Sequence, residues 1–168
     1  MPKKVSVTSI SFSSLLAIEM FEVRAGKGED SPDAYEALDG FVSSCTEIAV
    51  NLIDRQEHEA AKQVLEQVET VLRTGISQKY PNLLYKISYR FAELANSQGD
   101  AQESLQYLRQ AIVYAEDYDK SNKDPLLLMP AETYLNTAIA YQYAEKHREA
   151  LEAAQKADES SKKCIAAL

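Results

Sequence analysis

An internal repeat is the feature of this sequence that most constrains its fold. Three glutamates are each followed by a corresponding residue, Ala60, Ser104 and Ala150, and these residues stand 44 and 46 positions apart. Apolar residues recur four positions after them and twelve positions before them: Val64, Leu108 and Ala154, and Ile48, Ala92 and Ala138. Periods of roughly 20–50 residues are typical of stacked repeat proteins, whose units bury their apolar faces only against their neighbours. The repeat therefore predicts a stacked array without a built-in active site.

Prolines mark the start of a helix in each repeat. Pro32, Pro81 and Pro130 each precede an apolar stripe with helical spacing, and proline is tolerated in a first helical turn because its missing N–H has no partner there. Within the second repeat, Gly99 is followed by Asp100 and Glu103, a capping-box-like helix start. These signals predict an all-α solenoid of three antiparallel helical hairpins over residues 31–168. The hairpins are expected at about 32–75, 81–119 and 130–163.

Each expected helix carries a stripe of apolar residues at offsets of three and four, which predicts its buried face. The stripes are Phe41, Cys45, Ile48 and Leu52; Ala61, Val64, Leu65, Val68 and Leu72; Leu84, Ile87, Phe91 and Leu94; Leu105, Leu108, Ile112 and Ala115; Tyr134, Ala138 and Tyr141; and Leu151, Ala154 and Ala157.

Residues 1–30 form a separate amino-terminal segment. Ser14 is placed to cap a short helix from Leu15 to about Ala25, and Gly26 begins a polar linker. A targeting segment is the alternative interpretation. It is disfavoured because serines interrupt the short apolar run, no arginine precedes Arg24 and no small-residue cleavage site follows.

Composition narrows the class of protein. The 168 residues are 45% apolar, enough for one domain with a core, and the 26 acidic residues exceed the 18 basic ones by eight. A net charge of -8 disfavours a nucleic-acid partner, and no apolar run approaches the roughly 18–20 residues of a membrane span. The two cysteines have neither metal-type spacing nor the number needed for a disulfide scaffold. We therefore expect a cytoplasmic protein without nucleic-acid or membrane partners.

Motifs that carry chemistry are absent from the sequence. It has no glycine-rich phosphate loop, no nucleophile elbow and no His-Glu-x-x-His metal motif. His58 and His147 stand at helix starts. We interpret both as polar turn residues and not as metal ligands or catalytic bases. Cys45 lies on an apolar stripe and is expected to be a small core residue. We expect no enzyme, no cofactor and no metal.

Tyrosine is abundant, with ten residues and no tryptophan. Tyr107, Tyr114 and Tyr118 share one expected helix face, and Tyr134 and Tyr141 share another. Stacking on nucleotide bases would need a basic groove, but most of the charged residues between positions 100 and 119 are acidic. Packing between adjacent hairpins is therefore favoured, because tyrosine suits half-buried positions with a solvated hydroxyl.

The spaced positions resemble the tetratricopeptide repeat over about residues 41–163. The third hairpin matches best, at Tyr134, Ala138, Tyr141, Ala150 and Ala157, and the second matches at Phe91, Ala92, Gly99, Leu108 and Ala111, with Ser104 in place of the usual alanine. The first hairpin matches poorly, because Asn51 stands at the family's aromatic position and Gln67 at its last small position. The period exceeds the family's 34 residues, as in the long-helix variants of kinesin light chain, Pins-type spindle adaptors and MalT-like regulators. The resemblance implies a superhelix whose concave face is lined by the first helix of each hairpin.

That resemblance also implies a peptide-binding groove. Its positions correspond here to Lys86, Tyr89, Glu93, Asn96, Glu132, Leu135, Ile139, Gln142 and Tyr143. The carboxylate clamp of the chaperone-binding members is missing, because its lysine and asparagine positions are Cys45 and Ala49. Glutamates beside aromatic and apolar groups favour a partner with basic and apolar anchors. The alternative is that these residues are only solvated or packed between helices.

Two functions remain open at this point. The first is a non-catalytic interaction module, an adaptor or scaffold that binds a peptide or protein on the concave face. The second is a structural assembly subunit, which oligomerises or docks into a larger complex, such as a cytoskeletal or ciliary one, through its end faces. The apolar carboxyl-terminal residues, including Ile165 and Leu168, have two interpretations: either the chain is a piece of a longer array, or another molecule, such as a second copy in a homo-oligomer, covers this face. A sensory domain of a regulator is a third class, although the chain has no DNA-binding element.

Overall fold

The described part of the chain is entirely helical. The computed structural model describes residues 32–73, 80–121 and 128–166, which contain no β-strand. The helices are α2 (Pro32–Asp54), α3 (His58–Arg73), α4 (Pro81–Ser97), α5 (Ala101–Ser121), α6 (Leu128–Tyr143) and α7 (His147–Ala166). This confirms the predicted all-α fold. The short helix expected near residues 15–25, the expected end of the first hairpin at Gly75 and the terminal Leu168 lie outside the described residues.

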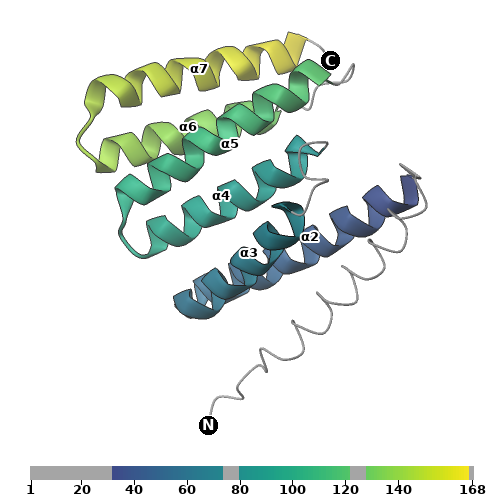
Figure 1. The fold of residues 1–168 in the computed structure, drawn as a ribbon. Coiled ribbons are helices and arrows are strands. Elements are labelled where there is room, and N and C mark those ends of the chain that lie inside the picture. The colour runs from purple at the N-terminus through teal and green to yellow at the C-terminus, as the bar shows by residue number, and fades with distance from the viewer. Residues whose placement is uncertain (1–31, 74–79, 122–127, 167–168) are drawn as a thin grey trace.

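Three antiparallel hairpins stack in the order of the chain (Figure 1). Consecutive helices pair as α2 with α3, α4 with α5 and α6 with α7. The second helix of each hairpin also packs on the first helix of the next, α3 on α4 and α5 on α6, while α2 contacts α4 directly. These contacts confirm a solenoid of helical hairpins, in which each unit covers the apolar face of its neighbour.

The three turns within the hairpins share one backbone geometry. Gln56, Gly99 and Glu145 occupy equivalent turn positions and have positive φ angles of 61°, 79° and 57°. In each turn the next residue donates its N–H to the carbonyl five residues earlier: Glu57 to Leu52 at 2.8 Å, Asp100 to Ala95 at 2.9 Å and Lys146 to Tyr141 at 2.9 Å. This left-handed cap satisfies carbonyl groups that a helix end leaves unpaired. Only the turn at Gly99 uses glycine, which explains why this turn was the easiest of the three to predict from the sequence.

Helix starts follow the expected signals with one shift. Asp100 caps α5, because its Oδ1 accepts a hydrogen bond from the Glu103 N–H at 2.9 Å. Pro32 and Pro81 are the first residues of α2 and α4. The prediction that Pro130 opens its helix was two residues late, since α6 begins at Leu128. Proline is accommodated there because the first four N–H groups of a helix have no intrahelical partner.

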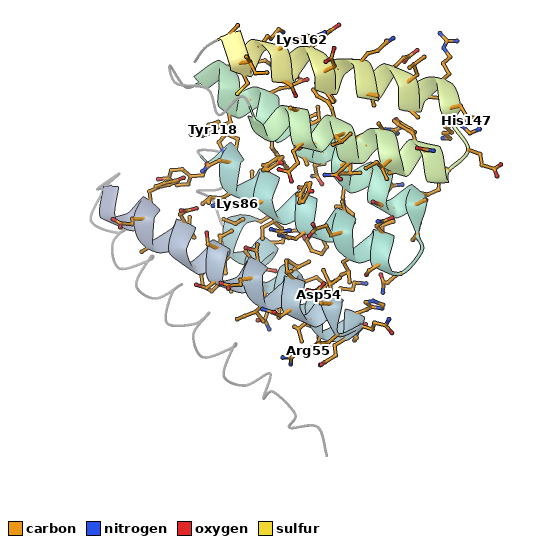
Figure 2. All side chains as sticks on the ribbon, turned by 180° about the vertical axis from the view of Figure 1, so that it is seen from behind. Asp54, Arg55, Lys86, Tyr118, His147 and Lys162 are labelled. Carbon is orange, nitrogen blue, oxygen red and sulfur yellow. The ribbon has the colours of Figure 1, made fainter. Side chains whose placement is uncertain are left out.

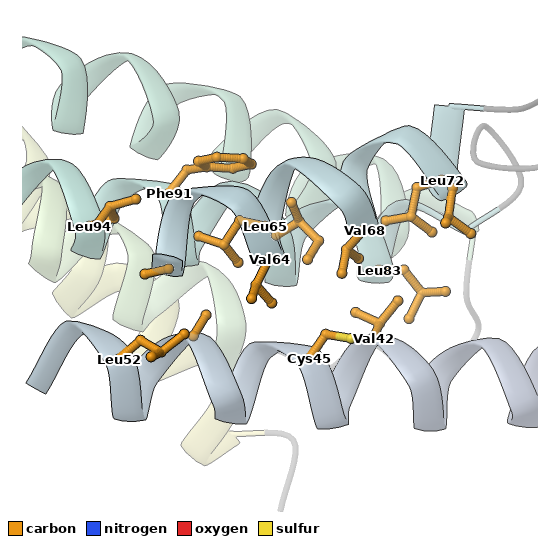
Figure 3. Close-up of a cluster of buried hydrophobic side chains, with 14 of the residues drawn as sticks. Val42, Cys45, Leu52, Val64, Leu65, Val68, Leu72, Leu83, Phe91 and Leu94 are labelled. Carbon is orange, nitrogen blue, oxygen red and sulfur yellow. The ribbon is translucent and has the colours of Figure 1, made fainter. Parts of the chain in front are cut away.

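The main core lies between α2, α3 and α4 (Figure 3). Its most deeply buried large side chains include Val42, Leu65, Val68, Leu72 and Leu83. All five residues predicted for the buried face of α3 are buried. Full burial of such a side chain stabilises the fold by about 1.5–3 kcal/mol, so this cluster anchors the amino-terminal half of the stack.

The predicted stripe of α2 was partly wrong. Cys45 and Leu52 are buried, but Phe41 is only half-buried and Ile48 is 37% exposed. The buried stripe is Leu38, Val42, Cys45, Ala49 and Leu52. Since α2 packs on both α3 and α4, its buried face is centred between these two helices, and Phe41 and Ile48 fall at one edge of it.

The predicted stripe of α7 was also partly wrong. Ala157 is buried, but Leu151 is 61% exposed and Ala154 is exposed, and Ala153 is buried in their place. In the repeat register Leu151 corresponds to Leu105 of α5, which the next hairpin helps to bury. Leu151 and Ala154 lie on a face of α7 that no helix of the described residues covers. We call this face, with Ile165, the outer face of α7.

Candidate functional site

Polar contacts hold the first helices of the hairpins side by side. Between α2 and α4, Lys86 donates to Asp39 Oδ1 at 2.7 Å and to Ser43 Oγ at 3.3 Å (Figure 2). Asn82 also donates to the Tyr35 hydroxyl. These hydrogen bonds lie beside the apolar core that α2 and α4 share with α3, and they add polar contacts to the packing of the two first helices.

Tyrosines of α4 make the corresponding contacts to α6. The Tyr85 hydroxyl accepts a hydrogen bond from Thr133 Oγ1 at 2.8 Å, and both side chains are buried. One turn on, the Tyr89 hydroxyl accepts from Asn136 Nδ2 at 2.6 Å and donates to Glu132 Oε1 at 3.4 Å. Burial raises the pKa of Tyr89 well above its usual range, and the neighbouring carboxylate of Glu132 raises it further. The phenol therefore stays protonated and keeps donating at alkaline pH values where an ordinary tyrosine begins to ionise.

A cleft opens beside Tyr89, between α4 and α6, with α5 beneath it. Its volume is about 180 Å³, and it is lined by Tyr89, Ala92, Glu93 and Asn96 of α4, Ser104 and Leu108 of α5, and Asn136, Ile139 and Ala140 of α6. Ser104 and Leu108 are 2% and 3% exposed and form the floor, whereas Ile139 is 42% exposed and stands at the rim. We call this site the α4–α6 cleft.

The α4–α6 cleft has an apolar floor and hydrogen-bonding walls. Ala92, Leu108 and Ala140 belong to one buried cluster with Leu105. The polar lining consists of two amides, two hydroxyls and the carboxylate of Glu93, and it includes no basic side chain. Glu93 is paired with Arg90 on its own helix, with Arg90 NH1 at 2.6 Å from Oε2. The lining therefore offers several acceptors and one carboxylate, which is already paired with Arg90.

Four of the nine residues predicted for the groove come together in this cleft: Tyr89, Glu93, Asn96 and Ile139. Lys86 is engaged with α2 instead, and Glu132 contacts the cleft only through Tyr89. Leu135 is 52% exposed and Gln142 is exposed, but neither lines the cleft. Tyr143 ends α6, and its side chain lies outside the described ones.

Five lining residues were missed by reasoning from the sequence: Ala92, Ser104, Leu108, Asn136 and Ala140. The resemblance assigned the groove to first helices alone, which excluded the two residues of α5. A usable signal existed for Asn136, because it follows Glu132 by four residues and precedes Ile139 by three on the same helix face. Ser104 was already conspicuous as a polar residue at a position where the family has alanine.

The two positions of the absent carboxylate clamp are not on the groove at all. Cys45 is 6% exposed and Ala49 is 0% exposed, and both belong to the core beside α3. Burial raises the pKa of the Cys45 thiol to about 11, which keeps it protonated and unreactive. The register carried over from the family therefore fails in the first hairpin, because α2 turns these positions toward its partner helix.

The two histidines stand at helix starts, and several tyrosines contact neighbouring helices. His58 and His147 begin α3 and α7, and the described residues contain no group of three or more His, Cys, Asp or Glu side chains that could hold a metal. Tyr107 stacks on Phe91 with ring centroids 4.9 Å apart. Between adjacent hairpins, Tyr141 of α6 accepts hydrogen bonds from Arg109 of α5.

None of the described helices is both long and apolar enough to cross a membrane. In comparisons with protein-family models and with curated proteins, no match to this sequence is found.

Proposed function

We propose that this chain is a non-catalytic interaction module of the tetratricopeptide-like kind, which binds a segment of a partner protein at the α4–α6 cleft. The cleft itself carries the proposal, since it combines an apolar floor with hydrogen-bonding walls. Its volume of about 180 Å³ is below the roughly 300–1,000 Å³ of small-molecule pockets. A side chain presented by another protein fits this size better than a cofactor does.

The surroundings of the cleft suit a protein partner. Leu135 and Ile139 lie four residues apart on α6 and are 52% and 42% exposed, so they extend apolar surface beyond the cleft. Interfaces of this kind combine a desolvated apolar centre with a polar rim, here supplied by Asn96 and Glu132. The lining side chains stand on helices rather than loops, which limits the entropy lost on binding. We place such a module in the cytoplasm, where its two free cysteines stay reduced.

A peptide selection with matched variants tests this proposal. Random peptides displayed on phage are selected against the full chain, and the selected peptides are then measured against Ile139→Glu and Leu151→Glu. Both changes place an acid at an exposed apolar helix position, but only Ile139 lines the cleft. We expect Ile139→Glu to weaken binding at least about tenfold, because the change removes apolar surface at the rim against which the partner packs, and Leu151→Glu to leave it unchanged. Equal binding to both variants would contradict the proposal.

A second function, assembly through the outer face of α7, is favoured by a separate observation. Leu151 and Ile165 are 61% and 69% exposed, the two most exposed large apolar side chains of the described chain. Sedimentation equilibrium with the same variants separates the two functions. Assembly predicts concentration-dependent association that Leu151→Glu weakens and Ile139→Glu preserves. A monomer at all concentrations argues against it.

A further inference from the structure

The chemistry of the α4–α6 cleft restricts the side chain that it can accept. Its lining carries one carboxylate, two amides and no base, which disfavours an acidic group and favours a donor with positive charge. Leu108, Ile139 and Ala140 provide apolar surface, against which a methylene stem packs while its charged head stays at the polar groups. The cleft, at about 180 Å³, is smaller than the roughly 300–1,000 Å³ of small-molecule pockets, which favours a single side chain as its occupant.

Two acceptors in the lining have unused capacity. Asn136 donates through Nδ2 to Tyr89, and this contact orients the amide and leaves its Oδ1 without a hydrogen-bond donor among the described residues. Glu93 uses Oε2 for Arg90, while its Oε1 receives no hydrogen bond from the described part of the chain. The Glu93 side chain is 38% exposed, so a second donor can reach it.

The ion pair between Arg90 and Glu93 is an example, within this chain, of a guanidinium bound to the carboxylate of the cleft. A guanidinium group already binds this carboxylate at 2.6 Å and lies 5.6 Å from the centroid of the Tyr89 ring. Because the pair is partly exposed, it contributes little net stability, and an incoming guanidinium can share or replace it at small cost.

We infer that the α4–α6 cleft receives a single arginine side chain of the partner segment, with its guanidinium bound by Glu93 and Asn136 and its methylene stem against Leu108 and Ile139. This inference rests on the proposed function, which it deepens by naming the anchor. Arginine is favoured over lysine because its planar group donates in several directions at once, to a carboxylate and to an amide oxygen, whereas an ammonium is a compact and strongly hydrated charge.

The test uses single-residue probes with the full chain. Nα-acetyl-arginine N-methylamide is titrated into isotope-labelled protein, and the side-chain amide signals of Asn96 and Asn136 are followed by NMR. The matched probes contain lysine, citrulline or norleucine. We expect the arginine probe to shift both amide signals with a millimolar dissociation constant that weakens as salt is added. The lysine probe should bind several-fold more weakly, and citrulline and norleucine should leave both signals unshifted.

Three variants locate the binding. Glu93→Gln should weaken the arginine probe at least about tenfold, because a charge-assisted hydrogen bond becomes a neutral one. Glu159→Gln makes the same change at an exposed position on α7 and should have no effect. Asn96→Asp adds a second carboxylate at the exposed end of the cleft and should strengthen binding several-fold, which provides a gain that a damaged fold cannot produce.

Several results would overturn the inference. Citrulline or lysine binding as well as arginine rules out guanidinium recognition. Equal weakening by Glu93→Gln and Glu159→Gln means that the probe responds only to overall charge. If phage-selected peptides lose binding with Ile139→Glu but contain no arginine, the anchor is wrong while the proposed function stands. If the arginine probe behaves as expected and Ile139→Glu spares every selected peptide, the proposed function fails independently.

Discussion

The Tyr89 hydroxyl of α4 accepts a 2.6 Å hydrogen bond from Asn136 Nδ2 of α6, and both side chains line the α4–α6 cleft. The contact that joins the second hairpin to the third is thus also a wall of the candidate site. Because the two helices are held together here by polar groups, a change in this bond alters both the stack and the shape of the cleft. Binding and stability are therefore expected to be coupled through Tyr89.

Removing the Tyr89 hydroxyl should measurably destabilise the stack. We expect Tyr89→Phe to lower the free energy of unfolding by about 1 kcal/mol, since the Asn136 amide loses its acceptor. Tyr114→Phe is the matched control, because among the described residues the Tyr114 hydroxyl accepts one exposed hydrogen bond, from Gln110 of the same helix. Urea denaturation followed by circular dichroism measures both. Equal losses in the two variants would mean that the contact between hairpins contributes nothing specific.

Two glycines should respond in opposite directions to alanine. Gly99 has a φ of +79° and Gly40 lies within α2, and a Cβ at either position meets no atom within 4 Å. Gly99→Ala should destabilise by about 1 kcal/mol because the left-handed conformation disfavours a Cβ. Gly40→Ala should stabilise by about 0.5–1 kcal/mol through helix propensity. Thermal unfolding of both variants provides the comparison, and a loss in Gly40→Ala would show that α2 is covered at this position in solution.

Leu105 and Leu151 occupy the same register position but different environments. Leu105 is 2% exposed, so Leu105→Ala should cost about 2–5 kcal/mol. Leu151 is 61% exposed, so Leu151→Ala should change the free energy of unfolding by less than about 0.5 kcal/mol. Chemical denaturation at several protein concentrations is the measurement. A large, concentration-dependent cost at Leu151 would indicate that the outer face of α7 is buried in an assembly.

Alkaline pH should destabilise the protein partly through Cys45. Burial raises the pKa of this thiol from its usual 9.0 to about 11. A raised pKa in the folded state means that the stabilising effect of the protonated thiol is complete below about pH 9. It is lost as the pH rises through about 11. The effect is on the order of 2 kcal/mol over this window.

Cys45→Ala isolates this effect, because the buried tyrosines contribute equally to both proteins. The free energy of unfolding should fall less steeply between pH 9 and 11 in the variant than in the wild-type chain. At neutral pH, a thiol reagent should modify the half-buried Cys164 much faster than the buried Cys45. Parallel pH profiles of the two proteins, or equal reaction rates of the two thiols, would contradict the burial of Cys45.

Reasoning from the sequence located the helices well because the signals that start and end a helix are local. Pro81 begins α4, and Asp100 caps α5 through the N–H three residues later. The same reasoning was least accurate where a helix packs on two partners. The spacing of Phe41, Cys45, Ile48 and Leu52 is helical, yet Ile48 is partly exposed because α2 contacts both α3 and α4.

The candidate site was predicted only in part for a related reason. Tyr89, Glu93 and Ile139 stand on first helices, which the repeat register places on the inner side of the stack. Ser104 and Leu108 reach the cleft from α5, and although Ser104 replaces the usual alanine, no local pattern places either residue at a cleft. Ser104 and Leu108 form the floor of a cleft only if the side chains of α4 and α6 next to them are small. Ala92 and Ala140 are small enough to leave the cleft open.

The sequence by itself determined that this protein is a stack of helical hairpins, where most of the helices begin and which residue types repeat. Propensity, capping and apolar periodicity act within a few residues of the chain, so they can be read without a structure. Only the tertiary structure decided which edge of each apolar stripe is buried, and that Tyr89 meets Asn136, 47 positions away. Such contacts depend on how helices cross and interdigitate, because the packing of side chains from separate segments is a property of the assembled fold and not of any one segment.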